Sequence, residues 1–318
     1  MSKLKHLTKE QKESIKKWED KLCCCVKTGD LKNAITFAAK LQKILKETGR
    51  MTRWMKNTNW LAECAIEAGD LSLAKQRLEG VTSIVNSNTR IFLEANALLS
   101  ICLLRKKDIE QAKKYIKITI ESINNVKSDK RRRQFQKRFI NRIEEECILS
   151  GLIESGKADL NVDAVQEKAV KLLALDKNSL ILQLASNLPE KSIFLLENVR
   201  NESIMLLPPR DQKFLPPPKT LKIPKEVATR ANAALKRVTW RAVCDPNDEI
   251  YQAWSSGLSV VYDKKWITAA IIGACKSWKI TTSMIVTTMV ALAFKMGVKV
   301  FCDVFFPESI MISLKDKE

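Results

Sequence analysis

Three short segments near the start of the chain repeat one another, and this repetition constrains the fold more than any other feature. They align without gaps, at steps of 40 and 38 residues, as TGDLKNA (28–34), AGDLSLA (68–74) and KKDIEQA (106–112). In the first segment Gly29 can adopt the left-handed conformation that ends a helix, and Asp30 can cap the helix that follows. The second segment has the same pair at Gly69 and Asp70, and the third keeps Asp108. Each segment therefore predicts a tight turn between two helices.

Apolar residues on both sides of each turn recur at the three- and four-residue steps of a helix. Around the second turn they are Leu61, Ala62, Ala65 and Ile66, then Ala74, Leu78 and Val81. Helix pairs that repeat at a fixed period and cannot bury their own apolar faces stack into an α-solenoid. We therefore predict an all-α chain whose residues 1–206 form a helical-repeat α-solenoid, with a buried set of Trp18, Ala34, Leu61, Ala74 and Ala112.

The repeated residues resemble the tetratricopeptide repeat. A helix carries Trp18, a turn with Gly29 follows eleven residues later, and Ala34 lies five residues past that glycine. The third unit keeps the later alanine but has Lys107 where the turn glycine would be. The units are longer than the family's usual length of about 34 residues, and the proline that closes each repeat is missing. The resemblance covers roughly residues 10–125.

This resemblance implies a protein partner that is held in a groove lined by the first helix of each pair. The lining positions in this chain would be Glu19, Lys27, Lys56, Asn59, Glu63, Glu67 and Arg105. Family members that hold a peptide's C-terminal carboxylate repeat a Lys-and-Asn clamp over adjacent units, and this chain lacks that repeated clamp. We therefore expect a groove of mixed polarity for a protein segment rather than a carboxylate site.

Positive charge is concentrated upstream of the C-terminal part. The chain has 55 Lys and Arg against 36 Asp and Glu, a net charge of +19. One fifteen-residue segment, SDKRRRQFQKRFINR, carries Lys130, Arg131, Arg132, Arg133, Lys137, Arg138 and Arg142. On a helix, Phe135 and Phe139 would dock on the solenoid and leave these basic residues outward. They are interpreted as a solvated face, as a nonspecific site for nucleic acid or an acidic partner, or as a site for anionic lipid.

Proline marks a boundary between two parts of the chain. Residues 207–224 hold six of the nine prolines, which disfavour helix and predict an extended linker. Residues 225–318 then form a small apolar, helical C-terminal domain in this interpretation. Within it, the first fifteen residues of the segment 280–306 carry no charge, yet as a helix they rise only about 22 Å, short of the roughly 30 Å of a bilayer core.

Two apolar runs, 266–275 and 280–306, are either a buried helical hairpin, a self-association module that makes a homo-oligomer, or a membrane contact. The β-branched residues 285–288 also leave a strand open. The apolar side chains expected in the oligomer or membrane contact are Trp266, Ile271, Ile285, Val290, Phe294, Val298 and Phe301.

The sequence does not predict a catalytic site. Nine cysteines, an odd number with no Cys-x-x-Cys pair, predict core thiols rather than a disulfide framework, and the first twenty residues lack a signal-type apolar stretch. Both features favour the cytoplasm, with the inner membrane surface as a peripheral location. The single histidine is His6, the glycines form no phosphate-binding loop, and Glu144 to Glu146 are interpreted as helix-surface residues. We therefore expect no enzyme, no metal and no cofactor.

The predicted function is that of a non-enzymatic adaptor or sensor, in which the solenoid holds a protein partner and the C-terminal helices self-associate. Two alternatives remain open at this stage. One is a bacterial toxin or anti-phage defence component whose C-terminal helices act on the inner membrane. The other is a nonspecific nucleic-acid-binding scaffold that uses the basic segment.

Overall fold

The computed structural model describes residues 4–153, 160–213, 224–244, 264–297, 300–302 and 308–311, and the regular secondary structure among them is helical. No strand occurs among them. Contacts divide the chain into two compact units, and each is described by itself. Unit 1 comprises Met1–Arg142, Met205–Asp211 and Glu308–Glu318, whereas unit 2 comprises Ile143–Ile204 and Gln212–Pro307.

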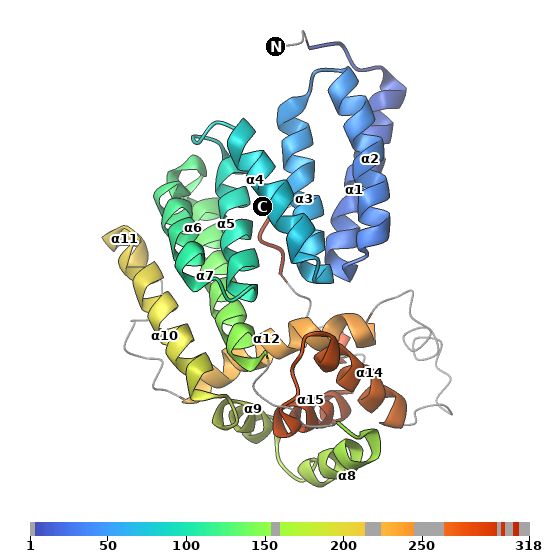
Figure 1. Ribbon diagram of the computed structural model, residues 1–318, viewed down its shortest axis with the longest axis vertical. Coiled ribbons are helices and arrows are strands. Elements are labelled where there is room, and N and C mark those ends of the chain that lie inside the picture. The colour runs from blue at the N-terminus through green and yellow to red at the C-terminus, as the bar shows by residue number, and fades with distance from the viewer. Residues whose placement is uncertain are drawn as a thin grey trace. The chain divides into compact units, whose positions relative to one another are not determined.

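Unit 1 is a series of helices in which each packs against the next along the chain from α1 to α6 (Figure 1). Helix α3 also contacts α1 and α5. This order of contacts is compatible with a helical repeat. The helices are α1 (Lys9–Thr28), α2 (Leu31–Glu47), α3 (Met51–Ala68), α4 (Leu71–Ile84), α5 (Arg90–Arg105) and α6 (Ile109–Glu121), followed by the 3₁₀ turn η1 (Ile123–Asn125) and the first part of α7 (Asp129–Leu152).

The predicted turns between the helices are confirmed. Gly29 and Gly69 end α1 and α3 in the left-handed conformation, with φ of 67° and 86°. At the third turn Lys107 adopts the same conformation, with φ of 63°, which an L side chain adopts only at a cost. The carboxylates that accept an N–H from the first turn of the next helix belong to Asp30, Asp70 and Asp108. The repeat is therefore kept at the third turn although its glycine is not.

Four of the five predicted core residues are buried: Ala34, Leu61, Ala74 and Ala112. The prediction for Trp18 was wrong, because its side chain is partly exposed. Its ring stacks on Phe37 with centroids 5.5 Å apart, and the ammonium group of Lys40 lies 4.3 Å from its centroid.

Unit 2 buries the apolar C-terminal runs. Its helices α14 (Lys264–Ser277) and α15 (Ser283–Met296) contact each other, and residues 285–293 of α15 are all buried. The strand considered for 285–288 is a helix. The cover includes helices that precede the proline-rich segment, since α8 contacts both apolar helices and α9 contacts α15. The remaining elements are the rest of α7, α8 (Val162–Leu172), α9 (Lys177–Ser186), α10 (Glu190–Met205) and α12 (Pro224–Cys244).

The proline-rich segment 207–224 lies mostly outside the described residues. Its first part contains a short helix, α11 (Pro209–Gln212), and its last residue begins α12. Residues 214–223 between them are not described.

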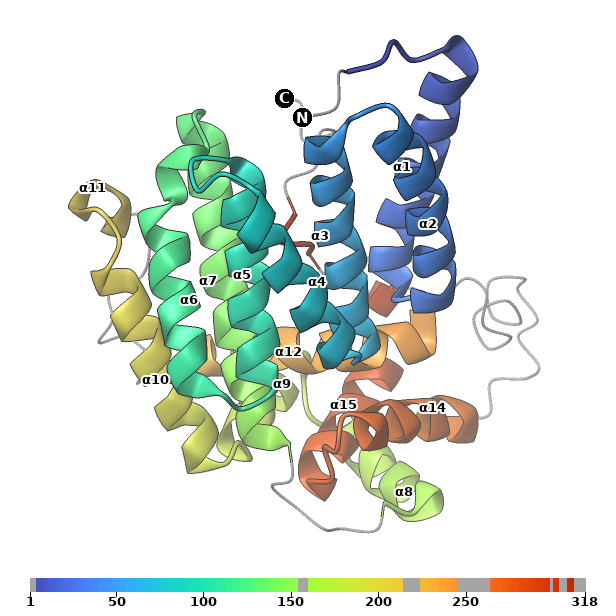
Figure 2. The same cartoon turned by 45° about the horizontal axis from the view of Figure 1, so that its top comes forward.

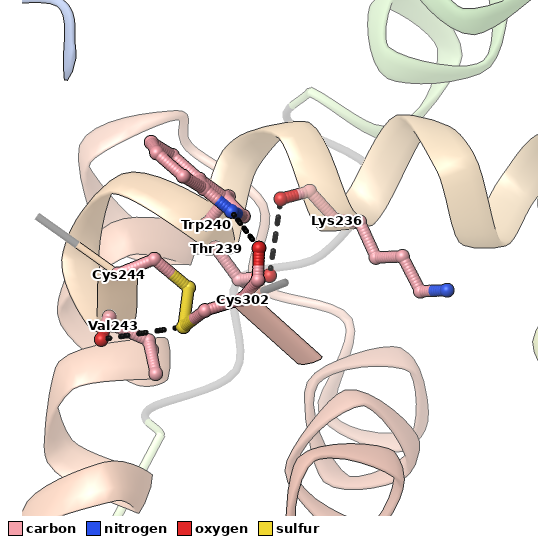
Figure 3. Close-up of a disulfide and its surroundings, with 6 residues drawn as sticks. All are labelled: Lys236, Thr239, Trp240, Val243, Cys244 and Cys302. Carbon is pink, nitrogen blue, oxygen red and sulfur yellow. Dashed lines mark hydrogen bonds between the residues drawn. A yellow bond between two sulfur atoms is a disulfide. The ribbon is translucent and has the colours of Figure 1, made fainter. Parts of the chain in front are cut away.

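A disulfide joins two distant parts of unit 2 (Figure 3). Cys244 at the end of α12 is bonded to Cys302, 58 positions later, and the Trp240 indole N–H donates to the Cys302 carbonyl at 3.3 Å. The prediction of thiols was therefore wrong for these two cysteines, because nothing in the local sequence indicates that they meet. The other seven carry thiols, and those in the core are Cys25, Cys64, Cys102, Cys147 and Cys275.

Candidate peptide-binding site

A segment from the far end of the chain binds to the middle of α3. The carboxylate of Glu63 accepts the backbone N–H of Ile310 at 2.6 Å on one oxygen, and the hydroxyl of Ser309 at 2.7 Å on the other. The second oxygen also accepts the backbone N–H of Met311 at 3.4 Å. Figures 1 and 2 show these C-terminal residues, in red, beside α3. We call residues 308–311 the tail.

The tail is bound as a non-helical segment with its apolar side chains buried. The side chains of Ile310 and Met311 are only 2% and 1% exposed. The Ser309 hydroxyl has two roles, because it donates to Glu63 and accepts the Met311 N–H at 3.1 Å. The contact therefore combines main-chain hydrogen bonds with the burial of two apolar side chains.

Glu63 is suited to this contact because an ionised carboxylate accepts hydrogen bonds and donates none. Its residue is 1% exposed, and this burial raises the pKa of Glu63 above its ordinary value. The Ile310 N–H, the Ser309 hydroxyl and the charge of Arg142 act in the opposite direction and favour the ionised form. Hydrogen bonds to charged groups contribute about 1.5–3 kcal/mol each. The tail therefore supplies hydrogen bonds that a buried charge at Glu63 needs.

A second carboxylate one helical turn further on completes a buried charge cluster. Glu67 of α3 forms an ion pair of 2.6 Å with Arg142 of α7, and both side chains are buried. Arg142 lowers the pKa of Glu63, whereas the negative charge of Glu67 raises it. The cluster thus contains two carboxylates and one guanidinium. Arg142 forms its ion pair with Glu67, and the three hydrogen-bond donors of the tail are bound by Glu63.

Two other predicted lining residues, Asn59 and Arg105, make hydrogen bonds between α3 and α5. Asn59, one turn before Glu63, is buried and donates its amide N–H to the Ile91 carbonyl at 3.0 Å. Its amide oxygen accepts no hydrogen bond from the described residues. Arg105 of α5 donates to the Ile66 carbonyl and thereby joins α5 to α3.

The remaining lining residues lie nearer to α1. Glu19 accepts hydrogen bonds from Arg53, at 2.7 Å on each oxygen, and from Asn57 at 3.0 Å. Burial alone would raise the pKa of Glu19, but these hydrogen bonds bring it below its ordinary value. Burial lowers the pKa of Lys56, while the nearby charge of Glu19 raises it. Lys27 of α1 is exposed to solvent, unlike the buried Asn59, Glu63, Glu67 and Arg105.

Sequence reasoning placed Glu63 and Glu67 in the site but missed what binds there. Ser309, Ile310 and Met311 follow the apolar run and carry no motif of their own. Their contacts with Glu63 join residues 246 to 248 positions apart, and no local signal reports such a separation.

The basic segment is divided between the surface and the interior. Arg132 is buried and forms an ion pair of 2.6 Å with Asp129, and Arg142 is committed to Glu67. Phe135 and Phe139 are buried, as predicted for the docking stripe. Arg131 and Arg138 are partly exposed, and the fully exposed members are Lys130, Arg133 and Lys137. A polyanion would therefore meet a smaller basic surface than the sequence suggests.

The residues expected at an oligomer or membrane contact are mostly inside unit 2. Phe294 is partly exposed, Trp266 is 60% exposed, and Val298 lies outside the described residues. No helix in the described part of the chain combines the length and apolar character needed to cross a bilayer. The fully buried members are Ile271, Ile285, Val290 and Phe301.

Buried ion pairs also join the helices of unit 2. Glu144 pairs with Arg200 at 2.8 Å and with Arg230 at 2.5 Å, so its interpretation as a helix-surface residue was wrong. The same correction applies to Glu145, which pairs with Arg237 at 2.9 Å, and to the buried Glu146. These ion pairs join α7 to α10 and α12.

Lys236 of α12 is a buried lysine whose charge depends on pH near neutrality. Burial lowers the pKa of Lys236 to about 7, and the charge of Lys177 acts in the same direction. Its side chain points away from the disulfide (Figure 3). Between about pH 7 and the ordinary lysine pKa of about 10.4, the unfolded chain holds a proton here that the folded chain has lost. Stability therefore rises with pH through this range.

No protein-family model, curated protein or solved structure matches this chain. Within the described ranges, no group of three or more His, Cys, Asp and Glu residues could hold a metal ion. The Glu63 site is the arrangement whose geometry points most directly to a ligand, because a protein segment already lies in it.

Proposed function

We propose that the protein is a non-enzymatic adaptor whose helices α1 to α6 form a short α-solenoid of tetratricopeptide type and hold a segment of a protein partner against α3. The observation that carries this proposal is the contact between Glu63 and the tail. It is a bound protein segment, recognised through two backbone N–H groups, on the helix face that the resemblance assigns to partner binding.

The chemistry of the site supports a peptide ligand in particular. Main-chain hydrogen bonds provide affinity for any extended segment, while pockets for side chains provide specificity. Glu63 accepts the main-chain hydrogen bonds, and the buried positions of Ile310 and Met311 provide the side-chain specificity. A buried carboxylate repels anions, so a free C-terminal carboxylate or a phosphate is a poor ligand for this position.

Support for the repeat architecture comes from independent features of unit 1. Each helix pair is joined by a turn with a residue in the left-handed conformation followed by an aspartate cap, and α3 contacts the helices two positions before and after it. This is the pattern expected when the first helices of successive pairs form one continuous face.

Self-association remains part of the proposal in a narrower form. Trp266 is the large exposed residue among the apolar set, and Phe294 is partly exposed. We expect Trp266→Asp to reduce the assembly size that light scattering measures for the full chain. A full chain that is monomeric at all concentrations would remove self-association from the proposal.

Peptide binding is tested with an array of immobilised peptides of varied sequence. The wild-type chain and the double variant Ile310→Asp/Met311→Asp, which should release the tail, are each compared with their Glu63→Gln counterparts. Glutamine keeps the shape of the side chain but turns an N–H donor toward the backbone donors of the ligand. Glu13→Gln on the exposed face of α1 is the matched control. If neither chain binds any peptide, or if Glu63→Gln leaves binding unchanged, the proposed function is wrong.

A further inference from the structure

We propose that the tail is an intramolecular competitor of the partner, and that partner segments carry the tail's own pattern, a hydroxyl residue followed by two apolar residues. This inference rests on the proposed function and specifies its ligand.

The main-chain part of the pattern follows from the two N–H groups that Glu63 accepts. They belong to the consecutive residues Ile310 and Met311. Proline has no backbone N–H and is therefore excluded at both positions. Every other residue type can supply these donors, so the main chain alone does not discriminate between partners.

The hydroxyl part of the pattern follows from the position of Ser309. Its oxygen lies 2.7 Å from a Glu63 oxygen and 3.1 Å from the Met311 nitrogen. Only a group that donates and accepts at once fulfils both roles, which selects Ser or Thr. Alanine at this position leaves the carboxylate with one donor fewer. A phosphate on the hydroxyl would place about two negative charges beside the Glu63 carboxylate, which excludes the phosphorylated segment.

The apolar part of the pattern follows from burial. The side chains of Ile310 and Met311 are almost fully buried. A charged side chain at either position would lose its hydration without an ionic partner, so the pattern requires apolar residues there.

Competition follows because the tail and the site belong to one chain. A segment tethered in this way acts at an effective concentration on the order of 1 mM. If the tail sequence binds in trans with a dissociation constant of about 100 μM, the tethered copy weakens partner binding about tenfold. The wild-type site is therefore closed to weak ligands and open to segments that bind more tightly than the tail.

The test uses a fluorescent synthetic peptide with the sequence of residues 307–315, PESIMISLK, and the full-length chain. We expect anisotropy to show binding to the Ile310→Asp/Met311→Asp variant that is at least about tenfold tighter than binding to the wild type. Peptides with alanine or phosphoserine at the Ser309 position should bind the variant at least about tenfold more weakly than the parent peptide. Adding Glu63→Gln to the variant should abolish binding, whereas adding Glu13→Gln should not change it.

A second measurement covers the case in which the double variant does not fold. Excess isotope-labelled peptide is added to the wild-type chain, and hydrogen exchange is followed at the chain's own residues 310 and 311. Faster exchange there supports displacement of the tail, and unchanged exchange at saturating peptide overturns the inference.

The outcomes separate this inference from the proposed function. Array peptides that bind through Glu63 but lack the hydroxyl and apolar pattern would overturn the inference and leave the proposed function in place. Equal affinity of the tail peptide for wild type and variant would overturn the competition alone. Absence of any peptide binding would overturn both.

Discussion

The close approach of α7 and α10 in unit 2 allows a sharp test of the packing. Gly151 lies where an added Cβ would come within 2.6 Å of the Ser192 Cα and 2.7 Å of its Cβ, and would also meet its hydroxyl oxygen. Real Cβ atoms essentially never approach other heavy atoms closer than 3.0 Å. We therefore predict that Gly151→Ala forces the two helices apart.

The magnitude follows from two opposing effects. Carbon atoms pack at about 3.5–4.0 Å, so the backbone of α10 must move by roughly 1 Å. Overpacking of this kind costs about 1–3 kcal/mol of the free energy of unfolding. Alanine is the better helix former and returns up to about 1 kcal/mol. With the full helix-propensity gain, the free energy of unfolding should therefore fall by about 0–2 kcal/mol, which lies about 1–3 kcal/mol below the value expected from helix propensity alone.

Two other glycines provide matched controls for the same substitution. Gly273 in α14 of unit 2 and Gly80 in α4 of unit 1 also lie inside helices, and an added Cβ at either would meet no heavy atom within 4 Å. Alanine at these positions should stabilise the chain by up to about 1 kcal/mol. Urea unfolding followed by circular dichroism measures all three variants against the wild type.

The comparison between Gly151→Ala and Gly273→Ala tests whether α7 and α10 are in close contact at Gly151. A Gly151→Ala chain as stable as the Gly273→Ala chain would refute the close contact between α7 and α10. Adding Ser192→Ala to Gly151→Ala should recover only part of the loss, because the Ser192 Cα remains in place. Complete recovery would mean that only the hydroxyl, rather than the backbone of α10, causes the clash.

Three further predictions concern charge and thiol chemistry. Lys236→Met should raise the melting temperature more at pH 6 than at pH 10, because a lysine with a pKa lowered to about 7 is charged in the folded chain only at the lower pH. Equal increases in melting temperature at the two pH values would contradict this lowered pKa. A thiol-alkylating reagent should modify exposed Cys24 before buried Cys275, because burial shields Cys275 and raises its pKa to about 12. Mass spectrometry showing the reverse order would contradict this burial. Nonspecific DNA binding at low salt should weaken steeply with added salt, and also when the exposed Lys130, Arg133 and Lys137 are replaced by alanine. If gel shifts at low salt detect no complex, these residues are only a solvated face.

The parts of the fold that sequence predicted correctly depend on local interactions. Asp30 caps its helix through an N–H three residues away, and Gly29 ends the preceding helix through its own left-handed conformation. Phe135 and Phe139 share one helix face because they are four residues apart. Such signals act within one or two turns of helix, so they can be identified in a single sequence.

The errors share one physical cause, which is that cover and partners come from distant segments. The apolar C-terminal runs were left open as a buried hairpin, a self-association module or a membrane contact, because their cover comes in part from α8 and α9, which contact α15 within unit 2. Glu144 was placed on a surface because its arginine partners, Arg200 and Arg230, belong to other helices. Trp18 was placed in the core, but its ring stacks on Phe37 of α2 and stays partly exposed. In each case the local pattern correctly indicated a helix but not its neighbours.

By itself the sequence determined that this chain forms helices, where the early turns lie, and that Glu63 and Glu67 share one face of α3. It could do so because helix caps, left-handed turn residues and the four-residue period act over a few residues. Only the tertiary structure decided that the tail binds Glu63 and that Cys244 meets Cys302. Those contacts join residues 246 to 248 and 58 positions apart, so they depend on how the helices between them pack and not on any local signal.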